Sequence, residues 1–154
     1  MKKQESLFRE EGYQLMGAAF EVYNENGSGL LEEIYQESLE IELALRGVPF
    51  RSKQELAVFY KGRELQKRYV PDLHVFGGIM VELKAVTELA PEHEAQVLNY
   101  LRIARQPVGY LINFAHRDTL QWKRFVFVRN CQRGLAQISG CSFWLRFRSE
   151  AQPR

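Results

Sequence analysis

Residues 69–84 of this chain read YVPDLHVFGGIMVELK, two apolar runs joined by a Gly-Gly pair. Apolar runs on either side of such a pair are typical of a β-hairpin. Each run nevertheless carries charge where a buried strand would be apolar, with Asp72 in the first run and Glu82 and Lys84 in the second. The stretch therefore predicts two neighbouring strands that bring charged side chains onto a sheet.

The form of the turn decides whether the three charges share one face. Glu82 and Lys84 are two residues apart, so on a strand they project from the same side. A two-residue loop would direct Asp72 to the opposite side. A three-residue loop would pair Val75 with Ile79, and Asp72 would then lie directly opposite Glu82. The charges act together only if the turn takes this longer form, with a left-handed glycine, or the strand carries a bulge.

Two directly opposed carboxylates repel each other unless positive charge lies between them. Mg²⁺ prefers oxygen ligands, so two carboxylates, a backbone carbonyl and a substrate phosphate oxygen would form a plausible site. Lys84 could then orient or deprotonate a water molecule and offset charge on the phosphate. Alternatively, these are ordinary charges on a solvated sheet face, where Glu82 and Lys84 neutralise each other. Spacing alone leaves both interpretations open.

The rest of the chain predicts one domain of mixed class. Apolar residues at three- and four-residue steps predict three helices, at residues 5–24, 30–46 and 91–105. Apolar or alternating runs predict five strands, at residues 56–60, 64–76, 79–86, 107–115 and 122–128. We therefore expect an α/β (α+β) fold of order ααβββαββ, in which helices flank a mixed central sheet of about five strands.

The composition is that of an ordinary globular protein. The chain has 154 residues, 45% of them hydrophobic, and a net charge of +2 that is too small to identify a nucleic-acid binder. No segment has the features of a signal peptide or a membrane span, so we expect a cytoplasmic protein. Cys131 and Cys141 do not form a CxxC pair, which indicates neither a zinc site nor a disulfide framework.

The end of the chain differs in charge from the rest. We expect a domain over residues 1–128 and a basic extension over residues 129–154, which holds five arginines and one acidic residue, Glu150. Residues 141–148 alternate enough between apolar and polar side chains to form a further edge strand. The extension is therefore not expected to be wholly irregular.

The hairpin residues match a known motif. Pro71 and Asp72, followed ten positions later by Glu82, Leu83 and Lys84, match every letter of the PD-(D/E)XK pattern. On these residues the chain resembles the PD-(D/E)XK nuclease superfamily. That resemblance implies a restriction-endonuclease-like core and a divalent metal ion, Mg²⁺ or Mn²⁺, held by the two acids and the backbone carbonyl of Leu83.

A second stretch extends the resemblance. GLLEEIY at residues 29–35 matches the Gly-x-x-Glu-x-x-Tyr signature of the small bacterial and archaeal GxxExxY family, which is assigned to the same superfamily. Glu32 and Tyr35 would lie one helical turn apart on one side. Glu32 could thus present a carboxylate to the metal, while Tyr35 packs or hydrogen-bonds behind it or contacts substrate.

The third helix carries a further motif. HEAQVLNYL at residues 93–101 is similar to the helical motif of that family, and its Gln-x-x-x-Tyr element also resembles that of recombination-type exonucleases. His93, Gln96 and Tyr100 fall on a single helical stripe. The stripe could simply face the core at His93 and Tyr100. Gln96 fits a core position poorly because a buried amide without partners is costly, so we expect it to contact phosphate or support the metal site.

The leading hypothesis is therefore a metal-dependent nuclease that hydrolyses phosphodiester bonds in nucleic acid, with DNA favoured over RNA. The expected metal ligands are Asp72, Glu82, Glu32 and the carbonyl of Leu83. Lys84 would position the attacking water, and the expected substrate contacts are Gln96, Tyr100, His93 and Tyr35. Because related nucleases often pair to cut two strands, a homodimer is a further hypothesis.

Two other function classes stay open. The chain could be a nucleic-acid-binding or regulatory module with little turnover, as the modest net charge would allow. Clustered carboxylates argue against this hypothesis, because a pure binder gains nothing by facing them toward a polyanion. The chain could also be an interaction protein whose aromatic residues form a partner surface: Trp122, Phe125, Phe143, Trp144 and Phe147.

Overall fold

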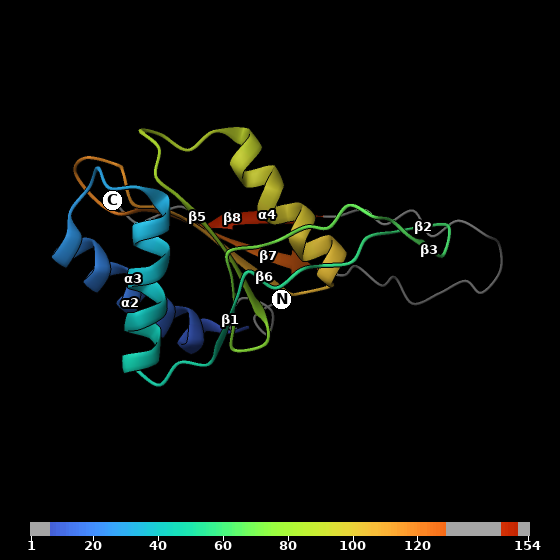
Figure 1. Ribbon diagram of the computed structural model, residues 1–154, viewed down its shortest axis with the longest axis horizontal. Helices are drawn as coiled ribbons and strands as arrows, with labels where there is room; N and C mark the ends of the chain where they lie inside the picture. Colours follow the sequence, from blue (N-terminus) through green and yellow to red (C-terminus); the bar gives the residue numbers. More distant parts are fainter. Residues whose placement is uncertain (1–6, 129–145, 151–154) are drawn as a thin grey trace.

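The computed structural model describes residues 7–128 and 146–150, and it contains three helices around a central sheet (Figure 1). The helices are α2 (Arg9–Asn26), α3 (Glu32–Leu45) and α4 (Pro91–Ala104). The central sheet is formed, in spatial order, by β1 (Phe50–Ser52), β4 (Leu73–Val75), β5 (Ile79–Lys84), β6 (Val108–Asn113), β7 (Gln121–Val128) and β8 (Arg146–Glu150). The expected mixed α/β fold is confirmed, with six strands in the described sheet.

The helices cover the two faces of the sheet, with α2 and α3 on one side and α4 on the other (Figure 1). Alternation along β5 divides its side chains between these layers. Val81 and Leu83 belong to the core formed with α2 and α3, whereas Met80 packs with Val97 and Leu101 of α4. Because both faces are covered, β6 is buried along its whole length and reads as a continuous apolar run.

The parallel pairing of β5 with β6 requires a crossover, which α4 provides. Pro91 begins this helix, at a position where its missing N–H costs nothing. Glu92 and Glu94 in the first turn suit the positive end of the helix dipole. The other neighbouring strands of the sheet pair antiparallel. The sheet is therefore mixed, as expected.

The turn between β4 and β5 takes the longer form. Val75 pairs with Ile79 across a three-residue loop, in which Phe76 and Gly77 have φ angles of 53° and 67°. Gly77 supplies the left-handed conformation that the sequence required. Continued by one position beyond Leu73, this register sets Asp72 opposite Glu82. Of the two turns that the sequence left open, the structure has the three-residue one, in which the charges share a face.

The expected strands at 56–60 and 64–76 are corrected by the structure. Most of this segment leaves the central sheet as a separate hairpin, formed by β2 (Phe59–Tyr60) and β3 (Arg63–Glu64). Polar and charged side chains dominate residues 61–68 and leave them no apolar face to bury. Only β4 at the end of the second run joins the sheet, where β1, which was not predicted, pairs with it.

Part of the basic extension belongs to the same sheet. β8 pairs antiparallel with β7 and partly overlaps the expected edge strand at 141–148. Cys131, Cys141, Phe143 and Trp144 lie outside the described residues, and the domain boundary at residue 128 stays a prediction. Within the described part, no helix is both long and apolar enough to cross a membrane.

Two of the aromatic residues that could have formed a partner surface, Trp122 and Phe125, pack within the protein instead. Phe125 is 2% exposed and packs in the core that lies against α4. Trp122 is half-buried and stacks on Tyr110, with 6.0 Å between the ring centroids. These two side chains therefore contribute to the interior and its border.

Gly109 allows α4 to approach β6 closely. A Cβ atom added there would lie 2.6 Å from Cγ1 of Val97. We therefore expect Gly109→Ala to lower the free energy of unfolding by about 1 to 3 kcal/mol, through overpacking, as measured by urea denaturation. Gly17→Ala is the matched control, because its Cβ would meet only the flexible end of Arg46 and a helical alanine is favoured. Equal stability of the two variants would contradict this account of α4 packing.

Candidate active site

A row of charged residues crosses the first three strands of the sheet. Asp72, directly before β4, and Glu82 on β5 lie opposite each other on the face that α4 covers, and each is only 4% exposed. Lys53 follows directly after β1, and its N–H donates to the backbone carbonyl of Asp72 at 3.0 Å. The order across the sheet is therefore cation, acid, acid.

Asp72 is held from several sides. One carboxylate oxygen, Oδ2, accepts a hydrogen bond from the backbone N–H of Leu83 at 2.7 Å. The other, Oδ1, forms an ion pair with the ammonium of Lys53. Burial alone would lower the pKa of Lys53, but the hydrogen bond and the charge of Asp72 outweigh it, so the pKa is raised. The aspartate thus has a fixed orientation toward β5 and a positive partner on β1.

Glu82 is only partly satisfied. Its Oε1 accepts a hydrogen bond from Nζ of Lys84 at 2.7 Å, whereas its Oε2 is buried and has no hydrogen-bond partner among the described residues. Burial raises the pKa of Glu82 to about 7, and the negative charges of Asp72 and Glu32 act in the same direction against Lys84. The site therefore contains a carboxylate oxygen that a proton or a cation would stabilise.

Helix α3 approaches this row with its first turns. Gln36 is buried, and its Nε2 donates to the backbone carbonyl of Asp72 at 3.1 Å and to Oε1 of Glu40 at 2.6 Å. Glu32, one turn earlier on the same stripe, is half-buried and acts on Glu82 through its charge. Within the described ranges, no three His, Cys, Asp or Glu side chains converge as a metal cluster. Glu32 thus lies in the surroundings of the two opposed acids.

Tyr35 does not reach the surface, which corrects its expected contact with substrate. It is fully buried, its hydroxyl donates to the carbonyl of Gly27 at 2.7 Å, and it accepts from the N–H of Leu30 at 3.1 Å. Its ring stacks on Phe114, with 4.7 Å between centroids. Tyr35 therefore fastens the loop that precedes α3, in agreement with the packing role considered for it.

Helix α4 brings Gln96 and Tyr100 to the same side as the acids. Nε2 of Gln96 donates to the hydroxyl of Tyr100 at 2.7 Å. Burial raises the pKa of Tyr100 above its usual range, and the negative charge of Glu82 adds to the effect. His93 has a different role, because its Nδ1 accepts from the N–H of Ala90 at 3.0 Å and caps the helix. The stripe thus divides into a capping residue and a hydrogen-bonded pair close to Glu82.

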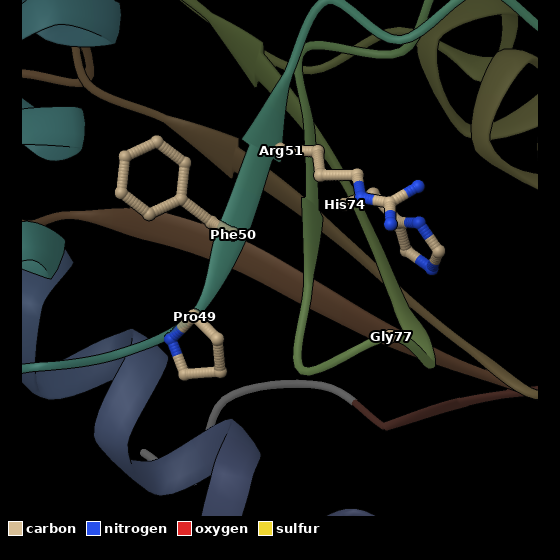
Figure 2. Close-up of a pocket in the computed structure, with 5 residues that line it drawn as sticks. All are labelled: Pro49, Phe50, Arg51, His74 and Gly77. Atoms are coloured by element: carbon tan, nitrogen blue, oxygen red, sulfur yellow. The ribbon is translucent and has the colours of Figure 1, made fainter.

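A separate pocket lies at the turn end of the β4–β5 hairpin, at the opposite end of β4 from Asp72. It has a volume of about 410 Å³. Arg51 on β1 and His74 on β4 are paired residues, and Figure 2 shows their side chains extending to the same side of these two strands. Burial lowers the pKa of His74, and the charge of Arg51 acts in the same direction, although a backbone hydrogen bond at Gly77 opposes them. This pocket contains none of the motif residues.

Lys53 and Gln36 were not anticipated as parts of the site. Gln36 follows Glu32 by four residues, so the helical stripe that carries the acid could have indicated it. Lys53 had no comparable signal, because its place beside Asp72 depends on the pairing of β1 with β4. Both residues contact Asp72. The ammonium of Lys53 pairs with its carboxylate, and the side-chain amide of Gln36 donates to its backbone carbonyl.

Comparisons with known proteins identify a family whose model covers the residues of this site. A family model described as "PD-(D/E)XK nuclease superfamily" matches residues 9–125, a range that includes all the site residues described above. A solved structure described as "Crystal structure of SSO0001" is similar at 17% identity and a TM-score of 0.49, over 60% of this chain and 48% of that chain. The chain thus spans about half the length of that protein. No curated protein matches the chain.

Because the carboxylate of Glu82 is only partly satisfied, we expect the stability of the protein to depend on pH. The pKa of Glu82 is raised from its ordinary value of 4.5 to about 7. Between these values the unfolded chain loses its proton before the folded chain, so stability falls as pH rises, and the penalty is complete above pH 7. With divalent cations chelated, we expect Glu82→Gln to stabilise the protein at pH 8 by about 2 to 3 kcal/mol.

Chemical denaturation at pH 8 and near pH 4 measures this effect, and the gain should vanish at the lower pH. Glu33→Gln on the exposed side of α3 is the control and should change little at either pH. A Glu82→Gln variant that is less stable than the wild type at pH 8 would show that the carboxylate is well satisfied.

Proposed function

Because this chain belongs to the PD-(D/E)XK nuclease superfamily, whose model matches residues 9–125, we propose that it is a divalent-metal-dependent nuclease that hydrolyses phosphodiester bonds in nucleic acid. The observation that carries the proposal is the buried pair Asp72 and Glu82, one of whose oxygens lacks a partner among the described residues. DNA as the favoured substrate, a cytoplasmic location, a homodimer and membership of the GxxExxY family stay predictions.

The donors present suit a cation that prefers oxygen ligands. Asp72 and Glu82 offer carboxylates, Leu83 between the motif residues offers a backbone carbonyl, and Glu32 adds negative charge nearby. Mg²⁺ and Mn²⁺ accept such oxygens and commonly keep several water molecules. When bound, such an ion would supply an activated water and would neutralise charge on the phosphate. The raised pKa of Glu82 is the local sign that this carboxylate needs a positive partner.

The two lysines have different proposed tasks. Lys84 is 14% exposed and already contacts Glu82, so its ammonium can hold the attacking water or an oxygen of the scissile phosphate. Lys53 is 54% exposed and balances the charge of Asp72. Because its side chain reaches solvent, Lys53 can exchange this partner for a substrate phosphate. Lys84 is thus the residue proposed for chemistry, and Lys53 the one proposed for charge balance.

Gln96 and Tyr100 are proposed as a joint contact to the phosphate. Their mutual hydrogen bond leaves the amide oxygen of Gln96 for another partner. The hydroxyl of Tyr100 donates to the carbonyl of Val70 at 3.5 Å, a long hydrogen bond that a phosphate oxygen could replace. Burial and the charge of Glu82 raise the pKa of Tyr100, so it keeps its proton. A neutral hydroxyl can donate a hydrogen bond to a phosphate oxygen near the acids.

A binding module with little turnover is the second candidate. It is favoured by the two lysine partners, since Lys53 and Lys84 give each acid a cation without any metal. The buried oxygen of Glu82 argues against it, because a binder of polyanions gains nothing from that cost. Metal uptake distinguishes the two candidates.

The nuclease proposal predicts cleavage of labelled nucleic acid only when Mg²⁺ or Mn²⁺ is present. Lys84→Ala should lower the rate by about 100-fold or more, because it removes the group that orients the water or stabilises the phosphate. Arg46→Ala is the matched control, since this side chain pairs with Glu42 at the C-terminal end of α3, the end opposite Glu32. Gel analysis of the products measures the rates, and thermal melting verifies that each variant is folded. Cleavage that persists in both Asp72→Ala and Lys84→Ala would come from a contaminating nuclease.

The charge balance at Asp72 predicts opposite effects on metal affinity. Calorimetric titration with Mn²⁺ should show uptake by the wild type and much weaker uptake by Asp72→Asn, which loses a charged ligand. Lys53→Met should bind Mn²⁺ about two- to fivefold more tightly, because the partly exposed ammonium no longer competes for the carboxylate. Arg46→Met should match the wild type, because this side chain lies at the end of α3 opposite Glu32. Negligible uptake by the wild type would favour the binding module.

A further inference from the structure

The hairpin of β2 and β3 is attached directly to the candidate active site. Its first arm leaves the row of charges after Lys53, and its second arm returns to that row at Asp72. The arms are joined by a bridge between Leu56 and Tyr69, with backbone hydrogen bonds of 2.7 and 3.1 Å. The ring of Tyr69 packs edge-on against Tyr100, with 5.8 Å between centroids. The hairpin therefore has a fixed base beside the acids.

The far end of the hairpin projects away from the rest of the described chain, on the side opposite α2 and α3 (Figure 1). Phe59 and Tyr60 are 61% and 63% exposed there, although large aromatic side chains are usually buried. They are consecutive strand residues, so their rings point to opposite faces of the hairpin. Two strands of two residues have no core of their own to bury them.

Positive charge surrounds these rings. Residues 57–70 contain four cationic residues and one acidic residue, Glu64, which pairs with Arg68. The other three cations are exposed and have no ion-pair partner in the described part of the chain: Lys61, Arg63 and Lys67. Nζ of Lys61 lies 5.6 Å from the centroid of the Tyr60 ring. The hairpin thus interleaves aromatic faces with unpaired cations.

We propose that this hairpin is a nucleic-acid-binding arm that holds an unpaired stretch of the substrate strand. Bases stack on Phe59 and Tyr60, while Lys61, Arg63 and Lys67 contact the phosphates. Aromatic rings stack on base faces, which are covered inside a duplex and open in a single strand. The inference rests on the proposed nuclease function and narrows its substrate to nucleic acid with a single-stranded segment.

The reach of the arm agrees with such a substrate. Tyr60 follows Lys53 by seven residues, so its backbone lies at most about 23 Å from the row of charges. A strand held at the tip can therefore extend along the arm to Lys84 while several of its nucleotides stay bound. The cations favour a polyanion over a protein surface, for which exposed aromatics alone would suffice.

Binding of a fluorescein-labelled oligodeoxythymidylate of about 20 nucleotides to the full chain tests the proposal. Anisotropy is measured in a chelator, so that binding is recorded without cleavage. The double variant Phe59→Ala/Tyr60→Ala should bind at least about tenfold more weakly. Tyr13→Ala is the matched control, because Tyr13 is 77% exposed but lies on α2. Tyr60→Trp should keep the affinity, and its added emission should be quenched by the oligonucleotide.

The charge contribution is measured from the dependence of affinity on salt. Lys61→Ala/Arg63→Ala should reduce the slope of log K against log salt by about 1.4, corresponding to two lost phosphate contacts on a single strand. The tip is exposed, so these variants should melt like the wild type. An unchanged slope would show that the cations do not contact the strand.

Three results would contradict the proposal that the hairpin binds a single strand. The first is wild-type affinity in Phe59→Ala/Tyr60→Ala, and the second is a loss of affinity in Tyr60→Trp as large as in that alanine variant. The third is a blunt duplex that binds as tightly as the single strand. The nuclease proposal fails separately, through absence of metal-dependent cleavage. Aromatic-dependent binding without cleavage would retain the arm in a binding module, whereas cleavage with binding insensitive to these variants would reject the arm alone.

Discussion

The register of the β4–β5 hairpin is the constraint on which the site depends. Side chains alternate along a strand, so a shift of one residue would move Asp72 to the face covered by α2 and α3 and leave Glu82 without its counterpart. The left-handed conformations at Phe76 and Gly77 set the three-residue turn. The hydrogen bond from the N–H of Leu83 to Asp72 then fixes the carboxylate toward β5. Local backbone geometry at a turn thus determines whether two distant acids can serve one site.

The same register brings two negative charges into a place with little solvent. Lys53 and Lys84 each neutralise one acid, but Oε2 of Glu82 keeps no partner in the described structure, and the pKa of this residue is raised to about 7 by burial and by the charges around it. Both acids are also held by neighbouring side chains, since Gln36 binds the backbone carbonyl of Asp72 and Tyr100 lies close to Glu82. Residues kept in a costly arrangement by a well-packed scaffold are typical of functional sites.

Much of this arrangement was predictable from the sequence. The periodicity of the three helices indicated the layers, and the spacing from Asp72 to Lys84 indicated the candidate residues. Whether the turn at the glycine pair sets Asp72 opposite Glu82 was left open by the sequence and is shown by the register of β4 and β5. The errors arose where short-range patterns and tertiary packing disagreed. Residues 56–60 have the composition of a strand but lie mostly in the projecting hairpin, whereas β1 is three residues long and carries little pattern of its own. The sequence does not indicate Lys53, because it does not indicate β1 either. The motif suggests a substrate contact for Tyr35 because it does not reveal that the hydroxyl of this residue binds Gly27.

The position of β1 at the border of the sheet has a consequence for how the acids are screened. β1 has β4 as its neighbour and contributes three residues, whereas β4 and β5 each have strands on both sides. Edge segments with few hydrogen bonds open by local unfolding at a lower free energy than the interior of a sheet. The ammonium that screens Asp72 is therefore carried by a segment that can fray, while both acids stay on the rigid part. The two halves of this ion pair differ in local stability, and the screening can be lifted without melting the domain.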